Sequence, residues 1–349
     1  MDGVDRFQRR HPVVAYPIAV LYKFNEDQGP YLAALLTYYG FLSLFPLLLL
    51  LASILGFVLQ DDPELQARIL DSALGQFPII GDQLATQGLQ GSAAAVVIGG
   101  LVATYGALGV AQALQNAVNV SWAVPRNRRP NAIKARGRSV LLILTAGLAV
   151  LTTTTLSVLG GSQAGDGMFS GGTALLTTLA AVLANTAVFS VAFRIASAIR
   201  VRTTEVLPGA FLSALVWQLL QLFGTAYVNG VVRGTSTTYG LFAVVLGLLA
   251  WIYFASIGIV FGIEVNVVRS KRLYPRALMT IFTDDVDLTD ADRQSYAEAA
   301  VAQRHKGFQD VAVRFEHGGQ NRTARRLGDV SGPDRAEEPH DGPGPDTDR

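Results

Sequence analysis

Cysteine is absent from this chain of 349 residues, and only four histidines occur. Without cysteine there is no disulfide framework, zinc–thiolate site, iron–sulfur cluster or cysteine nucleophile. The histidines all lie toward the two ends of the chain: His11, His305, His317 and His340. HExxH, P-loop and GxSxG motifs are also missing, and no close pair of carboxylates occurs in an apolar stretch. We therefore expect no metal site, no cofactor and no enzymatic activity.

Charge is scarce as well, and its distribution is uneven. Charged residues make up 16% of the chain, against about 25% in ordinary soluble domains. Residues 32–268 hold 19 charged residues in 237 positions, whereas residues 284–349 hold 24 in 66. A water-soluble globule, a fully disordered chain and a disulfide-rich secreted domain are all poor matches to this pattern.

Six stretches of at least 27 residues contain no Asp, Glu, Lys or Arg. They are 28–60, 83–125, 139–165, 167–193, 206–232 and 234–263. A bilayer core is crossed by about 20 apolar helical residues, and continuous apolar runs favour helices over alternating barrel strands. The sequence therefore predicts an all-α polytopic membrane protein with six transmembrane helices, near 33–59, 92–113, 140–160, 173–193, 207–228 and 240–267. A large buried helical core is the alternative.

The basic residues give these spans an orientation. With the N-terminus inside, 17 Lys and Arg flank the spans on the cytoplasmic side and 2 on the outer side, as the positive-inside rule requires for an N-in/C-in topology. The first apolar run is too long for a signal peptide. We expect a multi-pass membrane protein with both termini on the cytoplasmic side. The basic loop 126–138 is expected to contact anionic lipid headgroups rather than nucleic acid.

Three regions follow from this topology. Residues 1–31 form a cytoplasmic or interfacial segment, 32–268 the six-helix membrane domain, and 269–349 a cytoplasmic tail that is first basic and then acidic. The tail is expected to be largely disordered, above all from Gly318 onward, with partial helix over 296–313. Residues 61–91 are expected to form a short amphipathic helix on the outer face.

Polar residues inside the spans are the candidates for function, because each costs free energy unless it is paired. A polar pathway is the hypothesis for them, with packing the alternative; its members are Tyr38, Tyr39, Ser43, Gln218, Gln221, Asn229 and Glu264. Glu264 is a proton or ion site, or else pairs with Arg194, Arg200 or Arg269.

Other features of the spans indicate helix packing. Pro46 predicts a kink in the first span, and Gly258 and Gly262 form a GxxxG motif that permits close helix approach. Gln112, Gln115, Asn116 and Asn119 lie on one helical face, which we expect to face water rather than line a cavity.

Several segments form a recognisable set when taken in order. They are Asp27, the run from Tyr31 to Pro46, Ala113–Trp122 with Asn119, Pro208-Gly209-Ala210, Tyr239-Gly240, Trp251–Tyr253 and Gly262–Asn266. Together they resemble the YihY/BrkB family, and the likeness covers roughly residues 15–275. Thr37, Gly40 and Phe242 depart from the usual pattern.

The resemblance implies a multi-pass protein of the bacterial cytoplasmic (inner) membrane with six spans. The family carries the label virulence factor and an older label, ribonuclease BN, which the missing metal ligands argue against. A transporter, permease or flippase with a lipid or small-solute substrate is the favoured function. A non-catalytic envelope scaffold is the alternative, and a ribonuclease is the least favoured. The expected partners are membrane lipids and a second copy of the chain in a homo-oligomer.

Overall fold

The computed structural model describes residues 2–58, 93–161, 170–227, 237–278 and 288–315, and within these ranges it contains helices and loops but no β-strand. Six of the described helices have 25 residues or more: α3 (Gly29–Val58), α6 (Ala93–Ser121), α7 (Ala132–Gly161), α8 (Ser170–Ala196), α9 (Thr203–Tyr227) and α10 (Thr237–Lys271). The shorter ones are α1 (Asp2–Arg10), α2 (Pro12–Glu26), the 3₁₀ turn η1 (Arg126–Arg128) and α11 (Asp290–Ala302). The predicted all-α class is confirmed over these ranges.

Each predicted span coincides with one of the six long helices. Three helical segments in the described part of the chain are long and apolar enough to cross a membrane: Thr178–Ala196, Thr203–Gly224 and Val244–Lys271. This protein is therefore a helical membrane protein. The three segments lie in α8, α9 and α10.

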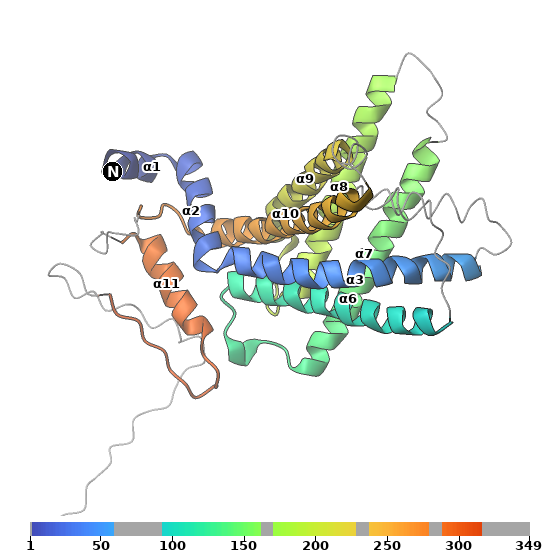
Figure 1. Ribbon diagram of the computed structural model, residues 1–349. Coiled ribbons are helices and arrows are strands. Elements are labelled where there is room, and N and C mark those ends of the chain that lie inside the picture. Colours follow the sequence, from blue (N-terminus) through green and yellow to red (C-terminus); the bar gives the residue numbers. More distant parts are fainter. Residues whose placement is uncertain (1, 59–92, 162–169, 228–236, 279–287, 316–349) are drawn as a thin grey trace, which may run out of the picture.

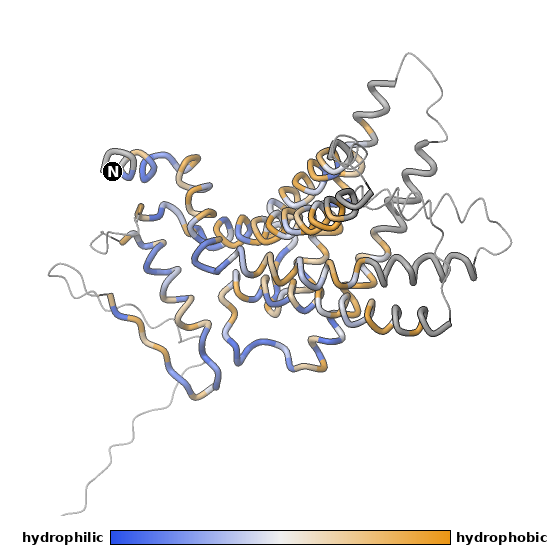
Figure 2. Tube along the Cα trace, in the orientation of Figure 1, coloured by the Kyte–Doolittle hydropathy of each residue, from blue (hydrophilic) through white to orange (hydrophobic). Residues whose placement is uncertain are grey.

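The long helices pack in a bundle in which helices far apart in the sequence, such as α3 and α10, lie side by side (Figure 1). α3 lies along α6 and also contacts α10, while α9 packs between α8 and α10. Hydrophilic residues gather at the end of the bundle where α1, α2 and α11 lie, which we call the capped end (Figure 2). Large apolar side chains point outward from the long helices; they include Leu101, Leu144, Leu148, Leu183, Leu222 and Phe223. Such an outer surface suits lipid better than water.

Glycines let α9 and α10 approach until their backbones touch. A Cβ on Gly209 would lie 1.8 Å from the carbonyl oxygen of Gly262, and a Cβ on Gly262 would lie 2.2 Å from Ser213 Oγ. Gly258 lies in the same way against Val216. Gly258 and Gly262, the two glycines of the GxxxG motif, therefore both lie at the contact with α9.

The partial helix predicted over 296–313 is confirmed for residues 296–302. These residues belong to α11, which begins earlier than predicted, at Asp290, and ends at Ala302, and residues 303–315 are not helical. The reason is a capping box: Thr289 Oγ1 accepts from the Asp292 backbone N–H, and the Asp292 carboxylate accepts from the Thr289 N–H. The helix predicted within 61–91 and the disorder predicted from Gly318 onward lie outside the described residues.

Candidate functional site

Glu264 is buried where three helices meet at the capped end. It lies on α10, less than two turns before Arg269, and no part of it is exposed. Ser121, the last residue of α6, donates its hydroxyl to Glu264 Oε1 at 2.5 Å. The second oxygen, Oε2, has no hydrogen-bond partner among the described residues.

The third helix is α2, which supplies a lysine and an aspartate. Lys23 is only 4% exposed, and its ammonium donates to the carboxylate of Asp27 one turn later and to the Ser121 carbonyl at 3.4 Å. Asp27 caps the C-terminus of α2, and its carboxyl also interacts with that of Glu264. Tyr16 holds α2 against α10 by donating its hydroxyl to the Val265 carbonyl at 2.9 Å. We call Lys23, Asp27, Ser121 and Glu264 the buried cluster.

The charges of the buried cluster do not balance, because one ammonium faces two carboxyl groups. Burial alone would lower the pKa of Lys23, but the carboxylates of Glu264, Asp27 and Glu26 outweigh it and raise that pKa above the usual value. Lys23 therefore stays charged at neutral pH. Burial also raises the pKa of Asp27, and the adjacent Lys23 offsets only part of this effect.

The ion-pair partners that the sequence suggested for Glu264 are not the ones that the structure shows. Arg194 is exposed at the end of α8, Arg200 is exposed in the loop after it, and Arg269 is exposed one turn further along α10. The contacts of Glu264 are instead with α2 and α6. Nothing in the sequence marks Lys23 as buried; its spacing of four from Asp27 is the usual one for a surface ion pair on a helix.

The remaining candidates of the predicted polar pathway lie in other parts of the bundle. Tyr39 and Ser43 pack on α6, with Tyr39 against Gly109 and Ser43 against Gly106. Tyr38 is 60% exposed, so it faces outward.

On α9, Gln218 and Gln221 are half-buried. Asn229 lies outside the described residues. Pro46 lies within α3, but its side chain is also outside the described part.

The amide stripe of α6 differs from the prediction that it faces water. Gln115 and Asn119 are buried, whereas Gln112 is exposed. Gln115 donates to Ser139 Oγ at 2.9 Å on α7, and Asn119 accepts from the Ala198 N–H at 2.9 Å after α8. These amides therefore join α6 to its neighbours, a role that periodicity alone does not separate from solvation.

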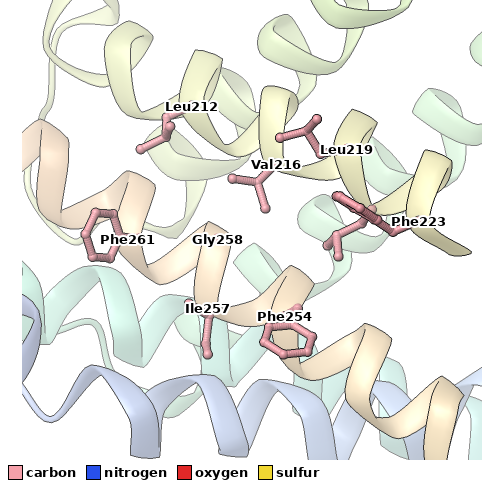
Figure 3. A pocket seen from close by; sticks show the side chains of 9 residues that line it. Leu212, Val216, Leu219, Phe223, Phe254, Ile257, Gly258 and Phe261 are labelled. Carbon is pink, nitrogen blue, oxygen red and sulfur yellow. The ribbon is translucent and has the colours of Figure 1, made fainter.

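An apolar groove of about 520 Å³ runs between α9 and α10 (Figure 3). Its lining is entirely hydrophobic or glycine: Leu212, Val216, Leu219, Leu220, Phe223, Phe254, Ile257, Gly258 and Phe261. Neither Gln218 nor Gln221 belongs to that lining. The groove lies between two of the segments that are able to span a membrane, so a lipid chain could reach it from the bilayer.

Within the described ranges, no group of three or more His, Cys, Asp or Glu is placed to hold a metal ion. The site is thus a buried ion cluster at one end of a bundle of membrane helices, with an apolar groove between two of those helices. This places the chain in the class of helical membrane proteins that bury ionisable groups.

The family follows from comparison with known sequences. The sequence model of the virulence factor BrkB family matches residues 20–280, and the chain belongs to that family. The matched range includes all four residues of the buried cluster.

Two curated relatives give the breadth of the similarity. The ribonuclease-like protein YfkH of Bacillus subtilis (strain 168) is 25% identical over 261 residues, which cover 72% of this chain and 93% of YfkH. The inner membrane protein YhjD of Escherichia coli (strain K12) is 27% identical over 275 residues, covering 70% of this chain and 78% of YhjD. No solved structure matches the chain.

Proposed function

We propose that this chain is a transporter of the bacterial inner membrane, of the permease or flippase type, with a lipid as its substrate. In this proposal all six long helices cross the membrane, and both termini are cytoplasmic. The asymmetry of Lys and Arg around the spans supports the orientation. The name of YhjD as an inner membrane protein supports the location.

The buried cluster is the observation that carries the proposal. An ionisable residue inside a membrane domain is costly and in most cases marks a substrate or ion pathway. Glu264 is fully buried, and one of its oxygens has no hydrogen-bond partner among the described residues. A protein that only held helices together would gain stability from an apolar residue there, because a buried ion pair often stabilises less than a hydrophobic replacement does.

The apolar groove favours a lipid over a polar solute. Its lining offers no polar side chain to bind a sugar, an amino acid or an ion. Its residues on α9, among them Leu212, Val216 and Leu219, recur every three or four positions and so form one continuous helical face. An acyl chain needs only such a surface, since the hydrophobic effect is not directional.

The test is lipid movement in vesicles reconstituted with the full chain. Fluorescent phospholipids should cross the bilayer faster than in empty vesicles, as measured by chemical quenching of the outer leaflet. Leu219→Trp, which fills the groove, should slow this movement. Leu183→Trp, at an exposed position of α8 outside the groove, should leave it unchanged.

Equal rates in protein-containing and empty vesicles would count against transport and favour the envelope scaffold. A scaffold of this kind would use the acidic tail as a contact surface. Two acids of the tail already form ion pairs within the chain, Glu298 with Lys271 and Asp292 with Arg276. We also propose that the chain is not a nuclease. RNA cleavage by the pure protein that a point substitution abolishes would contradict this.

The membrane surface is a second partner in this proposal. Four bases of the 126–138 loop are exposed, namely Arg126, Arg128, Lys134 and Arg136. We propose that they contact anionic headgroups, and that nucleic acid does not bind there. Association of two copies through the lipid-facing helices is part of the same proposal and is tested by cross-linking in vesicles.

A further inference from the structure

Hydrogen bonding in the buried cluster is incomplete in one specific place. Ser121 donates to Glu264 Oε1, and Lys23 donates to Asp27 Oδ2, yet the buried Glu264 Oε2 has no partner among the described residues. The Asp27 carboxyl interacts with that same Glu264 carboxyl. Two ionised carboxylates are both acceptors, so a hydrogen bond between them requires a proton on one of the two.

We propose that Asp27 and Glu264 form a proton-binding site that takes up one proton between their carboxyl groups, with Lys23 and Ser121 holding the pair in place. The protonated cluster is electrically neutral, since one ammonium then faces one carboxylate. Loss of the proton leaves a net negative charge in a largely buried site, which is costly in a medium of low polarity. No covalent bond other than the O–H bond forms or breaks.

The other charged groups near the site are exposed or paired elsewhere, so the proton binds at these two carboxyls. From α2, Lys23, Asp27 and the more exposed Glu26 act on the cluster. α6 contributes the Ser121 hydroxyl, and neither α3 nor α6 contains a charged residue. The one acid of α9, Glu205, accepts from the Arg202 N–H in its own first turn. On α10 itself, Lys271 pairs with Glu298 and Arg269 is exposed.

Water reaches the two carboxyls unequally, which gives the proton a direction of entry. The Asp27 side chain is 11% exposed, whereas Glu264 is fully buried. A proton therefore arrives by way of Asp27 from the capped end. If the transport proposed above holds, this proton is the coupling ion; proton binding itself does not depend on transport.

Infrared spectroscopy of the full chain in lipid nanodiscs tests the site. The carbonyl stretch of a protonated carboxyl should be present at neutral pH and disappear as the pH is raised. Glu264→Gln should abolish this titrating band. Glu298→Gln removes a carboxylate that pairs with Lys271 outside the cluster and should leave the band intact.

A milder variant keeps the test decisive if Glu264→Gln does not fold. Ser121→Ala removes the hydroxyl that donates to Glu264 and so removes a contact that favours the charged form. The band should then persist to a pH that is higher by about one unit, the value of a hydrogen bond to a charged group. A band that is absent at every pH, or that neither substitution changes, would overturn the proposal.

The outcomes separate this inference from the proposed function. A titrating band without lipid movement leaves the proton site standing and rejects the transporter. Lipid movement without a titrating band rejects the proton site and leaves the transporter standing.

Discussion

Two clusters at the capped end contain the same charges but differ in how they are satisfied. In the first, the Arg276 guanidinium lies between Asp292 and Glu26, and the arginine is fully buried. In the second, Lys23 faces Asp27 and Glu264. Each cluster has one cation and two carboxyl groups.

The carboxylates of the Arg276 cluster are completely hydrogen-bonded. Asp292 Oδ1 accepts from Arg276 Nε at 2.5 Å, and Oδ2 accepts from the Ala277 N–H at 2.9 Å and from Thr289. Glu26 accepts from Arg276 with one oxygen and from Ser295 Oγ at 3.1 Å with the other. The planar guanidinium fork suits such an arrangement. In the Arg276 cluster the buried atom without a partner among the described residues is a donor, Arg276 Nη1, whereas in the buried cluster it is an acceptor, Glu264 Oε2. Only an acceptor can take up a proton, which is the role proposed for the buried cluster.

The largest expected effect comes from breaking the Arg276 cluster. Arg276→Met leaves the buried Asp292 without its cation and should destabilise the docking of α11 by about 3–5 kcal/mol. Glu264→Gln should change the free energy of α11 docking by less than about 1 kcal/mol, because the ion pairs and hydrogen bonds described for α11 do not involve Glu264. Protease cleavage within 288–302 over a urea series measures both variants. Equal effects would remove the distinction between the two clusters.

Close helix packing gives the next largest effect. Gly209→Ala places a methyl group against the Gly262 carbonyl, where the structure leaves no room, and should destabilise the α9–α10 contact by about 1–3 kcal/mol. Gly147→Ala is the matched control, since a Cβ there meets nothing within 4 Å. The control should raise stability slightly through helix propensity. Thermal unfolding in detergent compares the two, and a tolerated Gly209→Ala would contradict the packing described.

The docking of α2 should depend on pH. The pKa of Asp27 is raised by burial, so the folded state holds its proton more tightly, and stability falls as the pH rises above the usual value of 3.8. The pKa of Lys23 is also raised, so its contribution is complete below the usual value of 10.5 and is lost as the pH rises through the folded-state value. Both groups therefore favour docking at lower pH.

A spin label at Val13, which is 86% exposed on α2, reports this docking as mobility. Mobility should rise with pH in the unmodified chain, and Asp27→Asn should remove the step on the acidic side. A label placed on α11, next to the Arg276 cluster, should show no such step. If the mobility of α2 does not depend on pH, the buried cluster does not change its protonation over this range, and it then behaves like the Arg276 cluster.

The smallest effects concern the bases of the 126–138 loop. An exposed base and one that is hydrogen-bonded within the protein should differ in their effect on stability. Arg136→Gln removes an exposed charge and should weaken binding to anionic vesicles by at most about 1 kcal/mol. Arg138 instead donates to the Ser197 carbonyl at 2.9 Å, so Arg138→Gln should also lower stability. Vesicle sedimentation and thermal unfolding separate the two effects. Binding to neutral vesicles that is just as strong would argue against headgroup contact.

The sequence predicted the helices well because their signal is local. Six gaps without charge coincide with six long helices, since apolar composition over about 20 residues is itself the physical property that a membrane span needs. The partial helix predicted over 296–313 was correct for 296–302 but missed the start of the helix. That start is set by the Thr289 and Asp292 capping box.

The candidate site was predicted in part. Glu264 was singled out, because an acid at the end of an apolar run is conspicuous by itself. Its partners Lys23 and Ser121 were not, because one was counted as an ordinary cytoplasmic base and the other is a small polar residue at a helix end. Tyr39 and Ser43 were grouped with Glu264 from composition alone, and the fold places them against α6 instead.

Composition and spacing by themselves therefore determined the class of protein, the position of its long helices and the residue at the centre of its site. The tertiary structure decided which groups surround that residue, because Lys23, Ser121 and Glu264 are separated by about a hundred residues or more along the chain. Their meeting depends on how α2, α6 and α10 pack. Packing also decided that one cluster has a donor for each carboxylate oxygen while the other leaves the buried Glu264 Oε2 without a donor among the described residues, a difference that two sets of the same charges do not reveal in the sequence.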